Sequence, residues 1–294
     1  SEFAINYAEN LFAIDFNGDK VQAHLDEFNI DIIIDHESFA NYGIASTEYE
    51  PYIEEAVHLW ESIIDTGLPQ VDIYGYSGED NQLVFNFGFD AANGVIDDLL
   101  IYIDAFNYDS DEVLGEGSVT EIRWTNDHTV GLPSQGHITF GTSVFSSDID
   151  RTAFVAHEIA HVLGFGTLWY NVYEDDSLDG PWNQYGQGNL IDEYGDFIGE
   201  YALTTFNELA EQAGGDTQNH VPVEKDGPPG TAYVHWDADN KKFKNLNIEF
   251  SQELMDGHVY ESNNHLSEIT ISSIKDLGYE TVEFGESYTQ LVSE

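Results

Sequence analysis

One apolar helix that carries ionisable side chains constrains the fold of this chain more than any other feature. Residues 149–163 predict a helix, with Ser147 or Asp148 as its N-cap and Gly164 as its C-terminal stop. From Ala153 to its end the helix is apolar except for two histidines and one glutamate. Because buried polar groups cost free energy without partners, the helix must lie in a core that offers those side chains a strong polar partner.

The polar side chains of this helix have the spacing of a metal site. His157 and His161 are four residues apart, so they lie on one helical face, one turn apart, and can bind a single Zn²⁺. Glu158 lies beside the first ligand, where it can take a proton from a zinc-bound water. The sequence HEIAH therefore predicts metal-assisted hydrolysis.

A hydrolytic zinc site needs a third protein ligand, and the local sequence does not supply one. In the spacing HExxHxxGxxH a third histidine follows a glycine; here Gly164 is present, but Thr167 stands at the ligand position. The third ligand must therefore come from farther along the chain. The candidates are downstream histidines and glutamates: His220, His235, His258, His265, Glu174, Glu193 and Glu200.

Two other interpretations compete at this point. In a thermolysin-like zinc enzyme, Glu193 or another glutamate would be the third ligand. In a salt-adapted surface or adhesion protein, the zinc would be structural. The intact Glu158 and the lack of an evident fourth protein ligand count against a structural zinc.

The rest of the sequence predicts an α+β fold. Apolar alternation and short apolar runs indicate strands, and a 3.6-residue period indicates helices. The predicted strands cover residues 28–35, 71–74, 83–87, 99–105 and 137–140, with a loop at 132–136. The other predicted helices cover residues 48–64, residues 200–212 and a stretch that begins at Ser267.

The chain is strongly acidic, with 8 Lys and Arg against 56 Asp and Glu and a net charge of −48. This balance argues against nucleic acid as a partner, because a nucleic-acid binder needs a basic surface. It indicates a solvated, salt-adapted surface, whose self-repulsion should make stability rise with NaCl or Ca²⁺. No apolar run reaches the roughly 18 residues of a membrane span.

Cysteine is absent from the chain. Disulfides, thiolate zinc ligands and a cysteine nucleophile are therefore excluded. The sequence begins with Ser1, Glu2 and Phe3, without a visible signal peptide. We interpret it as a mature or trimmed chain.

Clusters of oxygen-bearing side chains suggest Ca²⁺ as a second cofactor. Three such clusters lie at residues 15–19, at residues 109–112, and at Asp175, Asp176 and Asp179. Carboxylate and carbonyl oxygens suit this hard cation, although none of the clusters fits the EF-hand pattern.

Several motifs in combination resemble the leishmanolysin-like metzincins, especially their bacterial members. The main segments are HEIAHVLGFGTLW at residues 157–169, HWD at 235–237, ELMDG at 253–257, and LS with ITISSIKDLGY within 266–279. Upstream segments at residues 56–64, 96–99 and 132–136 extend the resemblance. It thus spans most of the chain.

The resemblance implies a zinc metalloendopeptidase with a metzincin-like catalytic domain, in which long helices lie above a twisted mixed sheet and a loop-rich C-terminal lobe follows. His235, 74 residues after His161, becomes the third zinc ligand, with His220 as the reserve candidate. Met255, the only methionine, becomes the Met-turn residue that packs beneath the metal. Glu158 becomes the base that activates a zinc-bound water for peptide hydrolysis.

These expectations extend to organisation and substrate. Residues 1–166 form an N-terminal lobe with the zinc helix, and residues 167–294 form a C-terminal lobe of the same catalytic unit. A protein or peptide substrate should add as a strand beside residues 136–140, which we expect at a sheet edge. We expect a secreted, extracellular monomer.

The chain departs from the family pattern in one respect that bears on the site. His235 and Met255 are 20 residues apart, which is longer than the pattern leads us to expect. The basic segment at residues 241–244 is therefore predicted to belong to an insertion. Leishmanolysin itself is rich in cysteine, unlike this sequence.

Overall fold

The computed structural model describes most of the chain in separate ranges. They are residues 12–14, 20–22, 27–68, 71–72, 95–108, 113–124, 131–169, 190–227, 230–237, 252–282 and 289–291. Within them the fold is a mixed α+β arrangement, as the sequence predicts.

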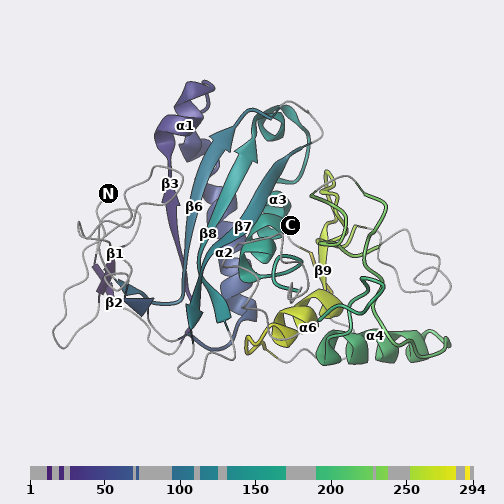
Figure 1. Cartoon of the computed structure of the whole chain (residues 1–294). Helices are drawn as coiled ribbons and strands as arrows, with labels where there is room; N and C mark the ends of the chain where they lie inside the picture. The colour runs from purple at the N-terminus through teal and green to yellow at the C-terminus, as the bar shows by residue number, and fades with distance from the viewer. Residues whose placement is uncertain are drawn as a thin grey trace, which may run out of the picture.

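A four-stranded mixed sheet forms the first half of the fold (Figure 1). Its order is β3 (Ile30–Ile34), β6 (Leu99–Phe106), β8 (Gly131–Gly141) and β7 (Gly115–Trp124). The first three strands are parallel, and β7 runs antiparallel to β8. In this sheet β7 is therefore an edge strand, beside the strand that precedes the HEIAH helix.

Two helices, α2 (Glu50–Ile63) and α3 (Arg151–Leu163), cover one face of this sheet. Side chains alternate across a strand, so Ile101 and Ile103 face the core below these helices, while Leu100 and Tyr102 belong to a separate cluster on the other face. Burial on both faces explains why β8 is buried along its whole length.

Direct contacts fix α3 against the sheet and against α2. The ring of Phe154 meets the ring of Phe140 edge to face at 5.0 Å. The indole of Trp60 on α2 donates a hydrogen bond of 2.9 Å to the carbonyl of Ala156. A Cβ on Gly136 would lie 2.1 Å from Val162, so glycine is required for α3 to approach β8 this closely. The helix that carries the candidate metal ligands is thus held from two sides.

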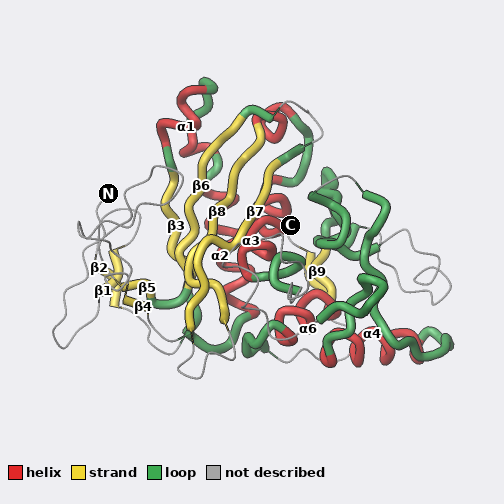
Figure 2. Tube along the Cα trace, viewed as in Figure 1, coloured by secondary structure: helices red, strands yellow, loops and turns green. Residues whose placement is uncertain are grey.

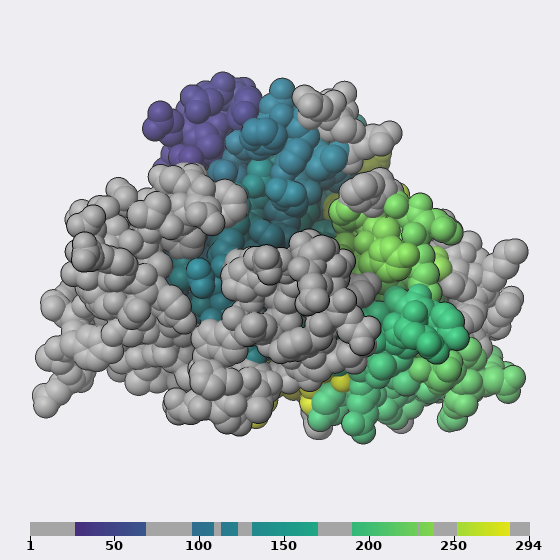
Figure 3. Space-filling view, in the orientation of Figure 1, coloured from purple at the N-terminus to yellow at the C-terminus, as the bar shows by residue number. Residues whose placement is uncertain are grey.

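The second half packs α4 (Glu200–Gln212) against α6 (Glu268–Asp276), beside the short strand β9 (His265–Ser267) (Figure 2). Figure 3 shows α4 and its neighbours in green, alongside the blue and teal elements of the first half. The rings of Phe165, Trp169, Phe197 and Trp236 pack edge to face or tilted in the interior, with centroids 4.5 to 5.5 Å apart. One hydrophobic cluster includes residues from both halves.

Smaller elements complete the described chain. The strand pairs are β1 (Phe12–Ile14) with β2 (Lys20–Gln22), β4 (Val71–Asp72) with β5 (Val95–Ile96), and β9 with β10 (Thr289–Leu291). The short helices are α1 (His36–Asn41), η1 (Ser46–Glu48) and η3 (Thr142–Ser146). Among the described residues, no helix combines the length and apolar character needed to cross a membrane.

The predicted helices are confirmed to within about two residues, with one correction at the start of α3. The N-cap is Asp150, whose carboxylate accepts a 3.1 Å hydrogen bond from the Ala153 amide, rather than Ser147 or Asp148. At the other end Gly164 adopts a left-handed φ of 113°, as a glycine stop requires.

Two predictions about strands are wrong. Residues 132–136 belong to β8 rather than to a loop; Pro133 is tolerated because pairing with β6 begins only at Gln135. Residues 136–140 are not at a sheet edge, because β8 lies between β6 and β7. The predicted strand at residues 83–87 lies outside the described residues.

Candidate metal centre

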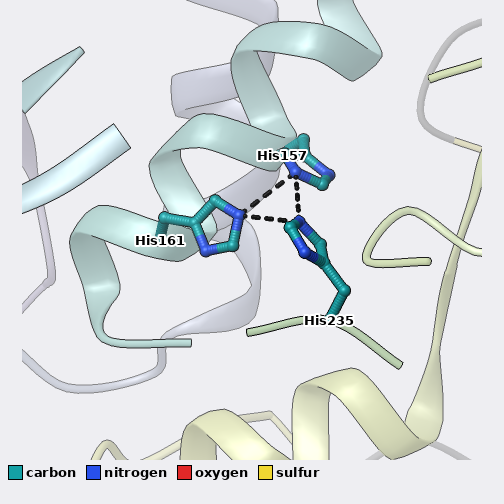
Figure 4. A group of neighbouring side chains, drawn as sticks. All are labelled: His157, His161 and His235. Carbon is teal, nitrogen blue, oxygen red and sulfur yellow. Dashed lines mark hydrogen bonds between the residues drawn. The ribbon is translucent and has the colours of Figure 1, made fainter. Parts of the chain in front are cut away.

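Three imidazoles from two distant parts of the chain converge on one point (Figure 4). His157 and His161 project from one face of α3, one turn apart, and His235 reaches them from the segment 230–237. The Nε2 atoms are 3.2 Å apart between His157 and His161, 3.1 Å between His161 and His235, and 3.0 Å between His235 and His157. The structure thus brings together the three histidines predicted as ligands.

The other ring nitrogen of each histidine faces a backbone carbonyl. His157 Nδ1 lies 2.6 Å from the oxygen of Leu254, and His161 Nδ1 lies 2.9 Å from that of Phe165. His235 Nδ1 lies 2.9 Å from the oxygen of Thr231. A carbonyl oxygen can only accept, so each Nδ1 must carry the proton and each Nε2 must present a lone pair.

This donor set fits a divalent transition metal. Three lone pairs that face one another at about 3 Å repel unless a cation lies between them. With Zn–N bonds of about 2.0–2.1 Å in a tetrahedral arrangement, ligand nitrogens are roughly 3.3 Å apart, close to the observed spacing. These atoms form a group that could hold a metal ion, and outer carbonyls fix the tautomers as metal sites require.

Burial keeps the three imidazoles neutral. It lowers the pKa of His157 to about 3, with a smaller contribution from His161, and lowers the pKa of His161 to about 4. The pKa of His235 is also well below its ordinary value, mainly through burial and then through the other two histidines. Protons therefore compete weakly with a metal for these nitrogens.

Glu158 lies in the same buried region, between α3 and the edge strand β7. Its carboxylate accepts a hydrogen bond from the Gly117 amide, and a Cβ on Gly117 would lie 2.3 Å from the Glu158 carbonyl oxygen. Burial, followed by the nearby Glu116, raises the pKa of the Glu158 carboxyl to about 8. A bound cation would counter this shift by favouring the carboxylate.

Met255 lies fully buried in the turn that follows Leu254, and its backbone touches the segment of the third histidine. The Met255 carbonyl accepts a 2.9 Å hydrogen bond from the amide of Trp236, next to His235. The same turn supplies the Leu254 carbonyl that orients His157. The turn that contains Met255 thus contacts the segments of two of the three histidines, and its role as a Met-turn stays a prediction.

Among the described residues, the alternative third ligands His258 and His265 are not part of the three-histidine group, although His258 is close enough to contribute to the lowered pKa values of His157 and His235. The Thr167 hydroxyl donates a 2.7 Å hydrogen bond to the His161 carbonyl, so it supports the end of α3. Glu193 and Glu200 are not part of the three-histidine group. Glu174 and the basic segment 241–244 lie outside the described residues.

The reserve candidate His220 belongs to a different cluster. Its ring nitrogens lie 3.9 Å from Asp192 and 3.7 Å from Asp196. These three could hold a metal ion by spacing alone. However, the Lys225 ammonium lies 2.8 Å from Asp196 and already supplies a positive charge there. The three predicted calcium clusters lie outside the described residues, so calcium stays a prediction.

Two features of the centre were not predicted from the sequence. One is the contact of Gly117 with Glu158, because a Gly-rich segment gives a weak strand signal. The other is Glu253, the fully buried residue before Leu254. In the segment ELM the resemblance points to the methionine alone, and the acidic residue in the same segment is the signal that could have revealed Glu253.

The comparison with known families agrees with this geometry. The sequence pattern of the leishmanolysin family, peptidase M8, matches residues 90–291. Because this match covers more than half of the chain and includes all three histidines, the chain belongs to the leishmanolysin family of zinc-dependent metalloproteases. No curated protein matches the sequence.

Proposed function

We propose that this protein is a zinc metalloendopeptidase with His157, His161 and His235 as the metal ligands. The observation that carries the proposal is the convergence of three Nε2 lone pairs at 3.0–3.2 Å, with every Nδ1 committed to a carbonyl. Three neutral protein ligands leave one coordination position for water or substrate, which is the arrangement of a catalytic rather than a structural zinc.

Glu158 is the proposed general base and acid. A zinc ion held by the three histidines would supply Lewis acidity that polarises the scissile carbonyl and lowers the pKa of the attacking water. The Glu158 carboxylate takes a proton from that water and returns it to the leaving amine. Its hydrogen bond from Gly117 holds it in place.

We further propose that the substrate binds along the edge strand β7. Among the residues that the structure describes, β7 pairs with β8 alone in the four-stranded sheet and forms its edge. A peptide that adds there as a further strand would run past Gly117, next to Glu158. This assignment replaces residues 136–140, whose strand lies inside the sheet.

Several broader properties are proposed on the sequence and the family resemblance. They are a metzincin-like arrangement with lobes at residues 1–166 and 167–294, secretion, a monomeric state, and calcium binding. Support for a single catalytic unit comes from the hydrophobic cluster that includes both halves.

The test combines metal analysis with a digestion assay. The purified protein should contain about one zinc per chain and degrade casein, lose that activity with a chelator, and regain it when zinc is restored. Glu158→Gln should bind zinc normally and lose turnover, because the amide cannot act as a base. Zinc binding without any peptide hydrolysis by the native chain would contradict the proposal and favour a structural metal.

A further inference from the structure

The carboxylate of Glu253, the residue before the Leu254 that contacts His157, is fully buried and accepts hydrogen bonds from four donors. One oxygen accepts from the Met255 amide. The other accepts from the Ser267 amide at 3.2 Å, from the Ser267 hydroxyl at 2.8 Å, and from the Thr270 hydroxyl. A buried carboxylate with this many partners is a rigid junction between the Met255 turn and the start of α6.

Trp236 connects this junction to the third histidine. Its indole nitrogen donates a 2.8 Å hydrogen bond to the Thr270 hydroxyl, which in turn donates to Glu253. The Trp236 amide donates to the Met255 carbonyl at 2.9 Å. The hydrogen bonds therefore close a ring through Trp236, Thr270, Glu253 and Met255, and Trp236 is covalently attached to His235.

The same junction also reaches the first histidine. Leu254 lies between Glu253 and Met255, and its carbonyl oxygen is 2.6 Å from His157 Nδ1. Its amide donates a 2.7 Å hydrogen bond to the His265 carbonyl. Glu253 precedes Leu254 in the chain and also accepts a hydrogen bond from the amide of Met255, which follows Leu254. Glu253 thus fixes the peptide group that contains the Leu254 carbonyl.

We propose that Glu253 is a positioning residue, which sets the directions of His157 and His235 through the Leu254 carbonyl and through Trp236. The inference rests on the proposed function of the site, but it concerns how the ligands are preorganised. When Glu253 is ionised it is an acceptor with no hydrogen atoms of its own, which suits the ring because all four groups that face it donate. Glutamine would turn one of the two oxygens into an NH₂ group, which cannot accept from the donors that face that position: the Met255 amide on one side, or Ser267 and Thr270 on the other.

A purely structural role for Glu253 makes a different prediction. If the carboxylate only joined α6 to the preceding turn, its loss would lower the melting temperature and leave the metal affinity of the folded protein unchanged. A positioning role predicts weaker zinc binding in a protein that is still folded. Loss of an outer-shell partner of a metal ligand typically costs 10- to 100-fold in affinity or activity.

The experiment measures zinc affinity by chelator competition and records the visible spectrum of the Co²⁺-substituted protein. Glu253→Gln should bind zinc about 10- to 100-fold more weakly and alter the Co²⁺ spectrum, with a fall in kcat and little change in KM. The matched control is Glu261→Gln, which changes an exposed glutamate nearby and should alter none of these quantities. Native zinc affinity and an unchanged Co²⁺ spectrum in folded Glu253→Gln would overturn the proposal.

A second pair of variants covers the case in which Glu253→Gln does not fold. Thr270→Val keeps the side-chain shape but removes the hydroxyl between Trp236 and Glu253, and should weaken zinc binding. Thr270→Ser restores a hydroxyl and should recover most of that affinity. Equal zinc affinity in the two variants would contradict the proposal that the hydrogen-bonded ring through Thr270 positions the zinc ligands. Because zinc affinity is measured without substrate, a native chain that binds zinc but cleaves no peptide would refute the proposed function alone.

Discussion

His157 Nδ1 and the carbonyl oxygen of Leu254 lie 2.6 Å apart, although the two residues are separated by 97 positions in the chain. The first histidine of the HEIAH helix is therefore oriented by the turn that contains Met255. His235 also belongs to the second half and meets both helix histidines. The second half thus supplies a ligand and also aligns one that the first half provides, so the centre forms only when both halves pack together.

Replacing His235 tests which distant residue completes the site. His235→Ala should reduce zinc affinity by far more than the roughly 10- to 100-fold typical of an outer-shell change, because a direct ligand is lost. Peptidase activity should fall with it. Chelator competition measures the affinity, and His220→Ala is the matched control, since His220 lies with Asp192 and Asp196. Unchanged zinc affinity in His235→Ala would contradict this assignment and favour a distant glutamate as the third ligand.

Replacing Gly117 tests the contact between the edge strand and the proposed base. A Cβ there would lie 2.3 Å from the Glu158 carbonyl oxygen, so Gly117→Ala must push β7 and α3 apart. Overpacking of this kind costs about 1–3 kcal/mol of stability. It should also lower kcat by displacing Glu158. Urea unfolding and steady-state kinetics measure both effects, with Ser118→Ala as a neighbouring control. If Gly117→Ala kept native stability and native kcat, the close contact between Gly117 and Glu158 would not require glycine, and the prediction would be wrong.

The sequence predicted the part of the centre that lies within one helix. His157, Glu158 and His161 follow from helical periodicity, because a spacing of four places two ligands on one face. The position of His235 depends on how a distant segment folds back, and only the family resemblance pointed to it. The strand β7 was missed because Gly115 and Gly117 weaken the strand signal, yet close packing against α3 requires glycine at both positions.

The stability of the chelated protein should depend on pH in two windows. The folded-state pKa values of Glu158 and Glu253 are raised to about 8 and about 7, mainly by burial. The folded state binds these two protons more tightly than the unfolded state, so the two carboxyls stabilise the fold at low pH. This stabilisation is lost as the pH rises through those values. The pKa values of His157 and His161 are lowered to about 3 and about 4, so their contribution is lost as the pH falls below about 6.5.

Chelated protein should therefore be most stable between about pH 5 and 6.5 and less stable at pH 8. Urea unfolding at a series of pH values in the presence of a chelator measures this profile. Glu158→Gln should flatten the decline between pH 6 and 8, because the amide does not titrate. Greater stability of the chelated native chain at pH 8 than at pH 6 would contradict the assignment of raised carboxyl pKa values.

Salt should stabilise the protein because 56 acidic residues face only 8 basic ones. Their mutual repulsion acts over about 30 Å at 0.01 M ionic strength but only about 3 Å at 1 M. The melting temperature should therefore rise steadily with NaCl. Sucrose, which is uncharged, is the control for general solvent effects. A melting temperature that stays constant across the NaCl series would show that the acidic surface does not limit stability.

Calcium separates screening from specific binding in the same experiment. If Ca²⁺ acts only through ionic strength, CaCl₂ and NaCl should give equal melting temperatures at equal ionic strength. If the acidic clusters form true sites, micromolar to millimolar Ca²⁺ should raise the melting temperature to a plateau at constant ionic strength, because a ligand that binds only the folded state stabilises it by mass action. Mg²⁺ is the matched control, since its stricter octahedral geometry suits flexible carboxylate sites less well. We expect the plateau with Ca²⁺, on top of the steady rise with NaCl, because both screening and site binding follow from a chain with this charge.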